Sequence, residues 1–245
     1  MPDMYEIYDH HAARYHELVQ HEDADGELRK AVYEIVNWRN TRVVEAGVGT
    51  GRVTGWYVKY ITSALLLDRS EDMIDQARNN LSPFLHRLTF RICENADLDR
   101  MKKQVMHPDV GNLGADIFIE GWSFGHTILD AEAAPGGGIE ERCDQLVHSA
   151  AAMIRNGGTL IFLETLGTNV ETPEAPVPGL ARFYTQLEAA YGFTRREIPT
   201  DYVFDSVEQA AELCGFFFGD DMAADIRARG SERVREWTGM WTRRV

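Results

Sequence analysis

The chain has 245 residues, of which 44% are hydrophobic and 26% are charged, so it is long and apolar enough to fold around one sizeable core. Its formal net charge of −14 disfavours nucleic-acid binding, because a polyanion is held mainly by Lys and Arg side chains. No apolar run approaches the ~20 residues that cross a bilayer, and residues 1–11 lack a secretory signal pattern, so we expect a cytoplasmic protein with no membrane partner.

Strand and helix patterns alternate from residue 41 onward. Apolar runs predict strands at residues 42–46, 63–68, 88–93, 115–121 and 159–164. Helical spacing of apolar residues predicts helices at residues 51–61, 71–81 and 139–158, the last of them stopped by Gly157. Buried strands that alternate with helices predict a doubly wound, mostly parallel α/β sheet with helices on both faces.

The regular alternation of strand and helix patterns ends after residue 165. Three prolines predict a loop at residues 171–179, and a helix is expected at 180–192. Further strands are expected at residues 193–204 and 233–245, which brings the sheet to seven strands. Between them, capping residues Asp205 and Ser206 open a helix at 207–219, and another helix follows at 220–230.

Three glycines follow the first predicted strand in the segment "VVEAGVGTGRVTG", residues 43–55. Gly47, Gly49 and Gly51 occupy a turn at the carboxyl end of the strand, where ligands of such sheets bind against the backbone. The dinucleotide pattern G-x-G-x-x-G fails, because Arg52 stands at its sixth position. The glycines alone are equally compatible with a turn that only permits close packing.

The stretch E-A-G-V-G-T-G resembles the first motif of the class I S-adenosylmethionine-dependent methyltransferases. Glu45 stands where that family commonly has an acid, and Asp68 follows at the spacing of the acid that receives the ribose hydroxyls. The segment "DRSEDMIDQAR" resembles the second motif, which implies that Met73 packs on the adenine ring. The resemblance covers residues 5–164 well and the remainder only in outline.

Later segments match the family in the same order. "ICENADLD" resembles the segment that contacts the adenine edge, with Asp97 replacing Glu94 if the register shifts. "ADIFIEGWSFGH" resembles the fourth motif, whereas Arg155 and Asn156 depart from the family's L-x-P-G-G pattern. The resemblance implies a cofactor-binding set of Glu45, Gly47, Gly49, Thr50, Asp68, Arg69, Met73, Glu94, Asn95, Ala96, Glu120 and Trp122.

Two side chains are candidates for catalysis. His126 follows the fourth predicted strand in an aromatic loop, and a histidine with a pKa near neutrality suits removal of a proton from the acceptor. The crowded segment "YEIYDHHAARYHELVQ" resembles the helical lid of small-molecule methyltransferases, in which Tyr15 would meet the methionine carboxylate and His16 is a reserve base. Both His126 and Tyr15 are also compatible with purely structural roles, as a backbone hydrogen bond for His126 and core packing for Tyr15.

We therefore expect one methyltransferase domain, with lid helices at 1–40, a cofactor-binding core at 41–165, and a cap with the last strands at 166–245. It would transfer a methyl group from S-adenosylmethionine to a small-molecule acceptor, as a monomer or homodimer. Alternatives are a cofactor-binding enzyme of the same fold with another reaction, or a non-catalytic scaffold. Residues 216–218, all Phe, suit an acceptor pocket, internal packing or a dimer contact.

We expect neither a metal nor a disulfide. Cys93, Cys143 and Cys214 lie far apart without C-x-x-C spacing, and no H-x-x-x-H pattern or carboxylate cluster accompanies the candidate site. The cysteines are therefore interpreted as small apolar residues.

Overall fold

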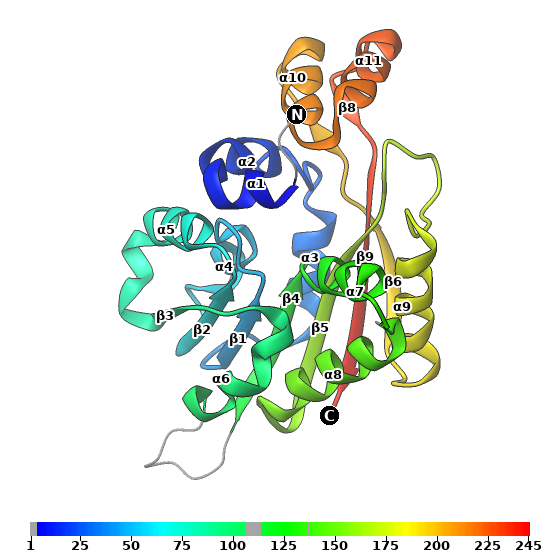
Figure 1. Cartoon of the computed structure of the whole chain (residues 1–245). Helices are drawn as coiled ribbons and strands as arrows, with labels where there is room; N and C mark the ends of the chain where they lie inside the picture. The colour runs from blue at the N-terminus through cyan, green and yellow to red at the C-terminus, as the bar shows by residue number, and fades with distance from the viewer. Residues whose placement is uncertain (1–3, 106–113, 137) are drawn as a thin grey trace.

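The computed structural model describes residues 4–105, 114–136 and 138–245 (Figure 1). Its main sheet contains β1 (Arg42–Ala46), β2 (Ser63–Asp68), β3 (Leu88–Ile92), β4 (Ala115–Gly121), β5 (Ile154–Thr168), β6 (Thr194–Pro199) and β9 (Glu236–Arg244). The strand order is β3-β2-β1-β4-β5-β9-β6, and β9 runs antiparallel to both of its neighbours. The predicted doubly wound, mostly parallel seven-stranded sheet is confirmed.

Helices cover both faces of this sheet (Figure 1). One face packs against α3 (Glu27–Ile35), α4 (Arg52–Tyr57) and α5 (Glu71–Asn80). The other packs against α6 (Leu98–Val105), α7 (Phe124–Ala133), α8 (Ile139–Ala152) and α9 (Pro178–Ala189). Successive strand residues serve opposite faces, so Val43 joins the first core and Val44 the second.

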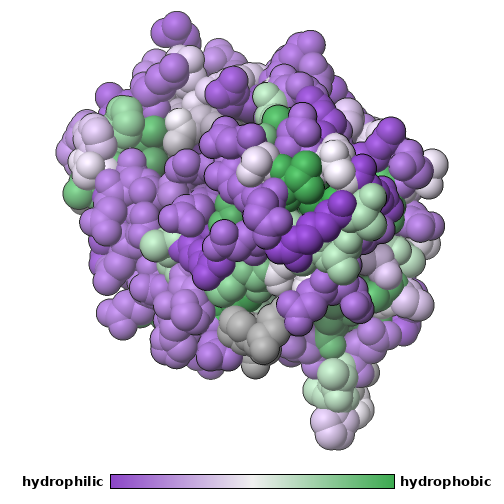
Figure 2. Space-filling model, turned by 90° about the horizontal axis from the view of Figure 1, so that it is seen from above, coloured by the Kyte–Doolittle hydropathy of each residue, from purple (hydrophilic) through white to green (hydrophobic). Residues whose placement is uncertain are grey.

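Two smaller units stand at the carboxyl ends of the strands. The lid consists of α1 (Met4–His10) and α2 (Ala12–Val19), and the cap of α10 (Val207–Phe218), α11 (Asp220–Arg229), β7 (Tyr202–Val203) and β8 (Arg233–Val234). Both lie above the sheet in Figure 1. The cap has its own apolar cluster, which Leu18 of the lid joins. From above, the molecule is mainly hydrophilic, with hydrophobic areas that are small and separate (Figure 2).

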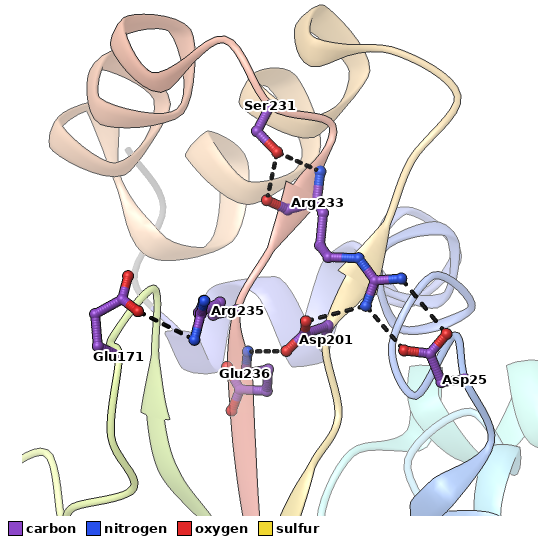
Figure 3. A network of polar contacts seen from close by, with 7 residues as sticks. All are labelled: Asp25, Glu171, Asp201, Ser231, Arg233, Arg235 and Glu236. Atoms are coloured by element: carbon purple, nitrogen blue, oxygen red, sulfur yellow. Dashed lines mark hydrogen bonds and ion pairs between the residues drawn. The ribbon is translucent and has the colours of Figure 1, made fainter.

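Polar contacts tie the lid region to the cap (Figure 3). Arg233 of β8 forms ion pairs with Asp25, which precedes α3, at 2.8 Å, and with Asp201, which precedes β7, at 3.0 Å. Asp201 also accepts a hydrogen bond from the backbone N–H of Glu236 at 3.2 Å. The start of β9 is thereby fixed against the base of the cap.

Several predicted elements had wrong limits. The helix expected to end at Gly157 ends at Ala152, because Ala115 of β4 already pairs with Ile154 of β5. Gly157 instead lies within β5 at a φ of 77°. The helix predicted at residues 51–61 ends at Tyr57.

The strands predicted at residues 193–204 and 233–245 were also wrong in extent. Each is divided into a strand of the main sheet and a short strand of the cap, because the chain leaves the main sheet to build the cap and then returns. Helices α6 and α7 were missed. The predicted N-cap is observed, since the hydroxyl of Ser206 accepts from the N–H of Gln209 at 3.2 Å.

Candidate active site

A cavity lies where β1, β2 and β4 end, beneath the lid. Of the predicted cofactor residues, those that line it are Gly47, Gly49, Asp68, Arg69, Met73, Glu94, Asn95 and Trp122. Both catalytic candidates, Tyr15 and His126, also line it. Residues from distant parts of the chain therefore meet at one cavity.

The three glycines of the first turn have different functions. All have left-handed φ values, of 68° at Gly47, 51° at Gly49 and 84° at Gly51, which a side chain disfavours. A Cβ at Gly47 would lie 2.5 Å from Ser123, and one at Gly51 would lie 2.9 Å from Leu81. A Cβ at Gly49 would meet no heavy atom within 4 Å. Packing thus requires Gly47 and Gly51, whereas Gly49 presents an open backbone surface to the cavity.

Asp68 holds this turn from the end of β2. Its Oδ2 accepts the N–H of Gly49 at 2.8 Å, and its Oδ1 accepts the N–H of Ser70 at 3.0 Å. Burial raises the pKa of the Asp68 carboxyl, while these backbone N–H groups favour its charged form. The carboxylate is therefore fixed in position at the cavity wall.

Met73 lies in the helix that follows. Its backbone N–H donates to the hydroxyl of Ser70 at 3.2 Å, which caps the start of α5. Met73 is only 2% exposed, although it lines the cavity. The hydroxyl of Ser70 also donates to the carbonyl oxygen of Tyr8 at 2.7 Å, so the same residue caps α5 and holds the lid.

Four predicted cofactor residues do not line the cavity. Glu45 is buried under α4, where it accepts hydrogen bonds from Thr54 at 2.6 Å and from the hydroxyl of Tyr57. Burial raises the pKa of Glu45 to about 7. It lies there because alternation along β1 directs its side chain to the α4 face of the sheet. Glu45 therefore supports the turn from beneath.

The other acid, Glu120, is buried at the end of β4. Its Oε1 accepts the N–H groups of Ser123 at 2.5 Å and Phe124 at 2.9 Å, which begin α7. Burial raises its pKa to about 7, and Glu164 of β5 lies beside it. Glu120 thus fixes the entry of α7, whose residues line the cavity.

Thr50 and Ala96 also contact protein groups outside the cavity. The hydroxyl of Thr50 is hydrogen bonded to Nδ1 of His16 at 2.8 Å, so the reserve base faces this turn rather than the cavity. The carbonyl oxygen of Ala96 accepts from the side-chain amide of Gln145 at 2.7 Å.

The lid contributes two tyrosines that were not among the candidate site residues. Tyr5 and Tyr8 line the cavity with Tyr15, and the ring centroids of Tyr8 and Tyr15 lie 5.4 Å apart. The hydroxyl of Tyr5 donates to Asp130 of α7, and the guanidinium of Arg69 lies 4.1 Å from the Tyr5 ring centroid. The i, i+3 spacing of Tyr5 and Tyr8 was the available signal for a shared helix face.

His126 lies in the first turn of α7 rather than in a loop. Its Nε2 is 3.3 Å from the hydroxyl of Tyr8. Burial lowers its pKa to about 4, so the expectation of a value near neutrality was wrong. The cavity residues Thr127 and Asp130 were missed with the helix, although Phe124 and Ile128 have helical spacing. His126 is a neutral imidazole across the physiological pH range.

Trp122, between β4 and α7, has a left-handed φ of 51°, which is uncommon for a residue with a side chain. Its backbone N–H donates to the carbonyl oxygen of Leu163 at 2.7 Å, and its ring lies 4.7 Å from the guanidinium of Arg52. Such backbone outliers cluster at functional sites.

Comparisons with known proteins give a likeness of structure alone. No family model and no curated protein matches the sequence. A protein from Anaeromyxobacter dehalogenans assigned as a type II methyltransferase superimposes with a TM-score of 0.55 at 13% identity, over 89% of this chain and 94% of that one. DhpI, solved with S-adenosylhomocysteine (SAH), gives 0.52 at 18% identity over 78% and 86%. The [4+2]-cyclase SpnF gives 0.53 at 16% identity over 89% and 80%.

The chain has the Rossmann-like fold of the class I methyltransferases. Within this fold the cavity described above lies at the carboxyl ends of the parallel strands, where such sheets bind ligands. No helix in the described part of the chain is long and apolar enough to cross a membrane.

A second cavity adjoins the first in this methyltransferase fold. Both are lined by Tyr8, Tyr15, Trp122 and His126. Phe217 and Phe218 of the cap line the second cavity. Phe216 instead contacts the lid, 4.4 Å from the guanidinium of Arg14 and 5.6 Å from the ring of His11. Two of the three cap phenylalanines therefore form the wall of a pocket.

Proposed function

We propose that this protein transfers a methyl group from S-adenosylmethionine to a small-molecule acceptor. The observation that carries the proposal is the open surface of Gly49 beside the fixed carboxylate of Asp68. A ligand can approach the Gly49 backbone where any Cβ would project into the cavity. The fold and the predicted motif favour S-adenosylmethionine as this ligand.

The lining residues suit the parts of that cofactor. Each oxygen of Asp68 accepts one backbone N–H and retains lone-pair capacity, so the carboxylate is suited to receive two ribose hydroxyls. Met73 offers an apolar surface for the adenine ring, and Glu94 and Asn95 offer polar groups for its edge. Tyr15 of the lid is proposed to face the methionine carboxylate.

The chemistry requires positioning above all. Bound S-adenosylmethionine supplies an electrophilic methyl group, and the protein must hold the acceptor in line with it and exclude water. The residues shared by both cavities lie where an acceptor and the cofactor would meet. Burial raises the pKa of both Tyr8 and Tyr15, so these hydroxyls remain protonated and act as donors.

We propose His126 as the group that accepts a proton from the acceptor. It is buried, uncharged and able to accept, but its low pKa makes it a weak base. Most of the rate enhancement is therefore assigned to orientation rather than to proton removal. The second cavity, whose walls come from the lid, the cap and the core, is proposed as the acceptor pocket.

A reaction without methyl transfer is the second candidate, because SpnF, a [4+2]-cyclase, has the same fold. Calorimetry with SAH tests cofactor binding. Incubation with methyl-labelled S-adenosylmethionine and panels of amines, alcohols and thiols, followed by mass spectrometry, tests transfer. SAH binding without labelled product would favour the second candidate. Absence of SAH binding would leave the scaffold interpretation or an oxidoreductase, which nicotinamide binding would detect.

A further inference from the structure

The second cavity has a largely apolar wall with acids set into it. The apolar side chains that line it include Leu18, Val19, Leu129, Pro176 and Leu180. The acids that line it are Glu22, Glu164 and Glu236, whereas no Lys or Arg among the described residues does so. Since this is the acceptor pocket of the proposed function, its chemistry indicates the class of acceptor.

Glu236 is the acid whose hydrogen bonding is incomplete. It is 4% exposed, and its Oε1 accepts from the hydroxyl of Thr165 at 3.1 Å. Its Oε2 is buried without a hydrogen-bond partner among the described residues. An unpartnered buried oxygen is costly, so a ligand that donates to it gains an unusually favourable contact.

The other two acids already have partners. Glu22 forms an ion pair with Arg52 at 2.9 Å, which offsets its charge. Oε1 of Glu164 accepts the N–H of Gly125 at 2.6 Å, and its carboxyl lies beside that of Glu120. Glu236 is therefore the acid of this wall that is free to pair with a ligand.

Burial favours the neutral form of Glu236. Its pKa is raised well above the usual range by burial first and then by the charge of Glu22, while Thr168, Thr165 and Arg52 act in the opposite direction. A ligand cation beside Glu236 would restore the carboxylate and gain a charge-assisted hydrogen bond.

Aromatic rings that line the second cavity also favour a positively charged ligand. Tyr8, Tyr15 and Phe217 contact one another, with centroid separations of 5.4, 5.3 and 6.1 Å, and all three line the pocket. The faces of such rings carry negative potential and attract cations. The described residues contain no group of three or more His, Cys, Asp or Glu side chains able to hold a metal, which disfavours an inorganic cation.

We propose that the second cavity binds an apolar organic molecule that carries an ammonium group, and that this ammonium pairs with Glu236. The ammonium is a recognition group, because a protonated nitrogen has no lone pair with which to attack a methyl group. Molecules in which a carboxylate or phosphate replaces the ammonium cannot form this ion pair, because they bring no cation that would restore the Glu236 carboxylate.

Three probes with a common ring test the proposal: 2-phenylethylamine, 2-phenylethanol and 3-phenylpropionate. Each is titrated near neutral pH into the full chain saturated with SAH. We expect the amine to bind at least about tenfold more tightly than the carboxylate, with the alcohol between them. Equal binding of amine and carboxylate would overturn the proposal.

Substitutions then locate the contact. Glu236→Gln keeps the shape and removes the charge, so it should weaken amine binding at least about fivefold and change alcohol binding little. Glu232→Gln, at an exposed acid four residues earlier, is the matched control and should leave all three affinities unchanged. Amine binding that is unaffected by Glu236→Gln would also refute the assignment.

Leu129→Trp tests the pocket itself. Leu129 lines the second cavity and not the first, so a larger side chain there should block all three probes. The SAH titration of each protein separates the two proposals. If the unmodified protein binds SAH but shows no preference for the amine, only the proposed class of acceptor is wrong. If the unmodified protein does not bind SAH, the proposed function itself is wrong.

Discussion

The two sides of the active site are held by different kinds of interaction. On the core side, Gly47 and Gly51 are packed against neighbouring side chains, and Asp68 is fixed by two backbone N–H groups. On the lid and cap side, contacts between aromatic rings, such as Tyr15 with Phe217, and exposed ion pairs, such as Arg14 with Glu212, join the two units. The proposed cofactor surface therefore rests on backbone groups and one fixed carboxylate, whereas side chains of the lid and cap form much of the proposed acceptor surface.

The largest expected effect tests the core side. Gly49→Val should abolish SAH binding, because its side chain would project into the cavity at a left-handed backbone position. Calorimetry measures the binding. Gly192→Val is the control, since Gly192 has a similar φ of 68° and open space around it but does not line the cavity. Undiminished affinity in Gly49→Val would remove the basis of the proposed site.

The second effect concerns the boundary between the two sides. Once an acceptor is known, His126→Asn should lower turnover about 10²-fold, the lower end of the range for a general base, and leave the SAH dissociation constant within about threefold. Because burial lowers the pKa of His126 to about 4, the acidic limb of the wild-type rate profile should lie near pH 4. His148→Asn, at an exposed histidine of α8, is the control. An unchanged rate would assign His126 a structural role.

The difference between the core side and the lid and cap side also explains how much of the site can be predicted from the sequence. The turn at residues 47–51 and the acid at residue 68 are predictable, because glycine spacing and strand length are local properties of the chain. The contact of Tyr5 with Asp130 joins residues 125 positions apart, so no local pattern reveals it. α7 was missed because residues 120–126 were interpreted as a loop, whereas Glu120 accepts the N–H groups that begin a helix there.

The third prediction tests how firmly the core side is held. Burial raises the pKa of the Glu45 carboxyl from 4.5 to about 7 in the folded protein. Between these pH values the folded protein keeps a proton that the unfolded chain has lost, so the free energy of unfolding falls as the pH rises through this range. Glu45→Gln removes this loss while retaining an acceptor for Thr54. We expect equal stability near pH 4, and a variant more stable on the order of 3 kcal/mol near pH 8.

Urea unfolding of both proteins across this pH range measures that difference. Glu94→Gln is the control, since Glu94 lies exposed beside Arg69. A pH-independent difference between Glu45→Gln and the wild type would mean that Glu45 does not titrate in this window.

The fourth prediction concerns Asp68. Asp68→Ala removes the acceptor of the proposed ribose bonds, so SAH affinity should fall about 10- to 100-fold, which corresponds to roughly 1.5 to 3 kcal/mol. Asp97→Ala is the matched control, because Asp97, the alternative adenine contact, does not line the cavity. If both variants bind SAH as tightly as the wild type, the ribose assignment is wrong.

The smallest effect is expected where the lid region meets the cap. Arg233→Met removes the ion pairs with Asp25 and Asp201, but backbone hydrogen bonds from Asp23 to Thr200 and from Ala24 to Asp201 remain. Exposed ion pairs contribute little and are screened by salt, so the Tm should fall by no more than about 2 to 4 °C, and by less at high salt.

The matched control is Arg227→Met, which removes the 2.6 Å ion pair with Glu208 inside the cap and leaves the connection to the lid region intact. Both variants should lower the Tm similarly. Only Arg233→Met should speed SAH dissociation, by about two- to threefold in stopped-flow measurements, because of these two arginines only Arg233 contacts the segment that follows the lid. Equal dissociation rates would mean that the ion pairs of Arg233 contribute to stability without affecting ligand exchange.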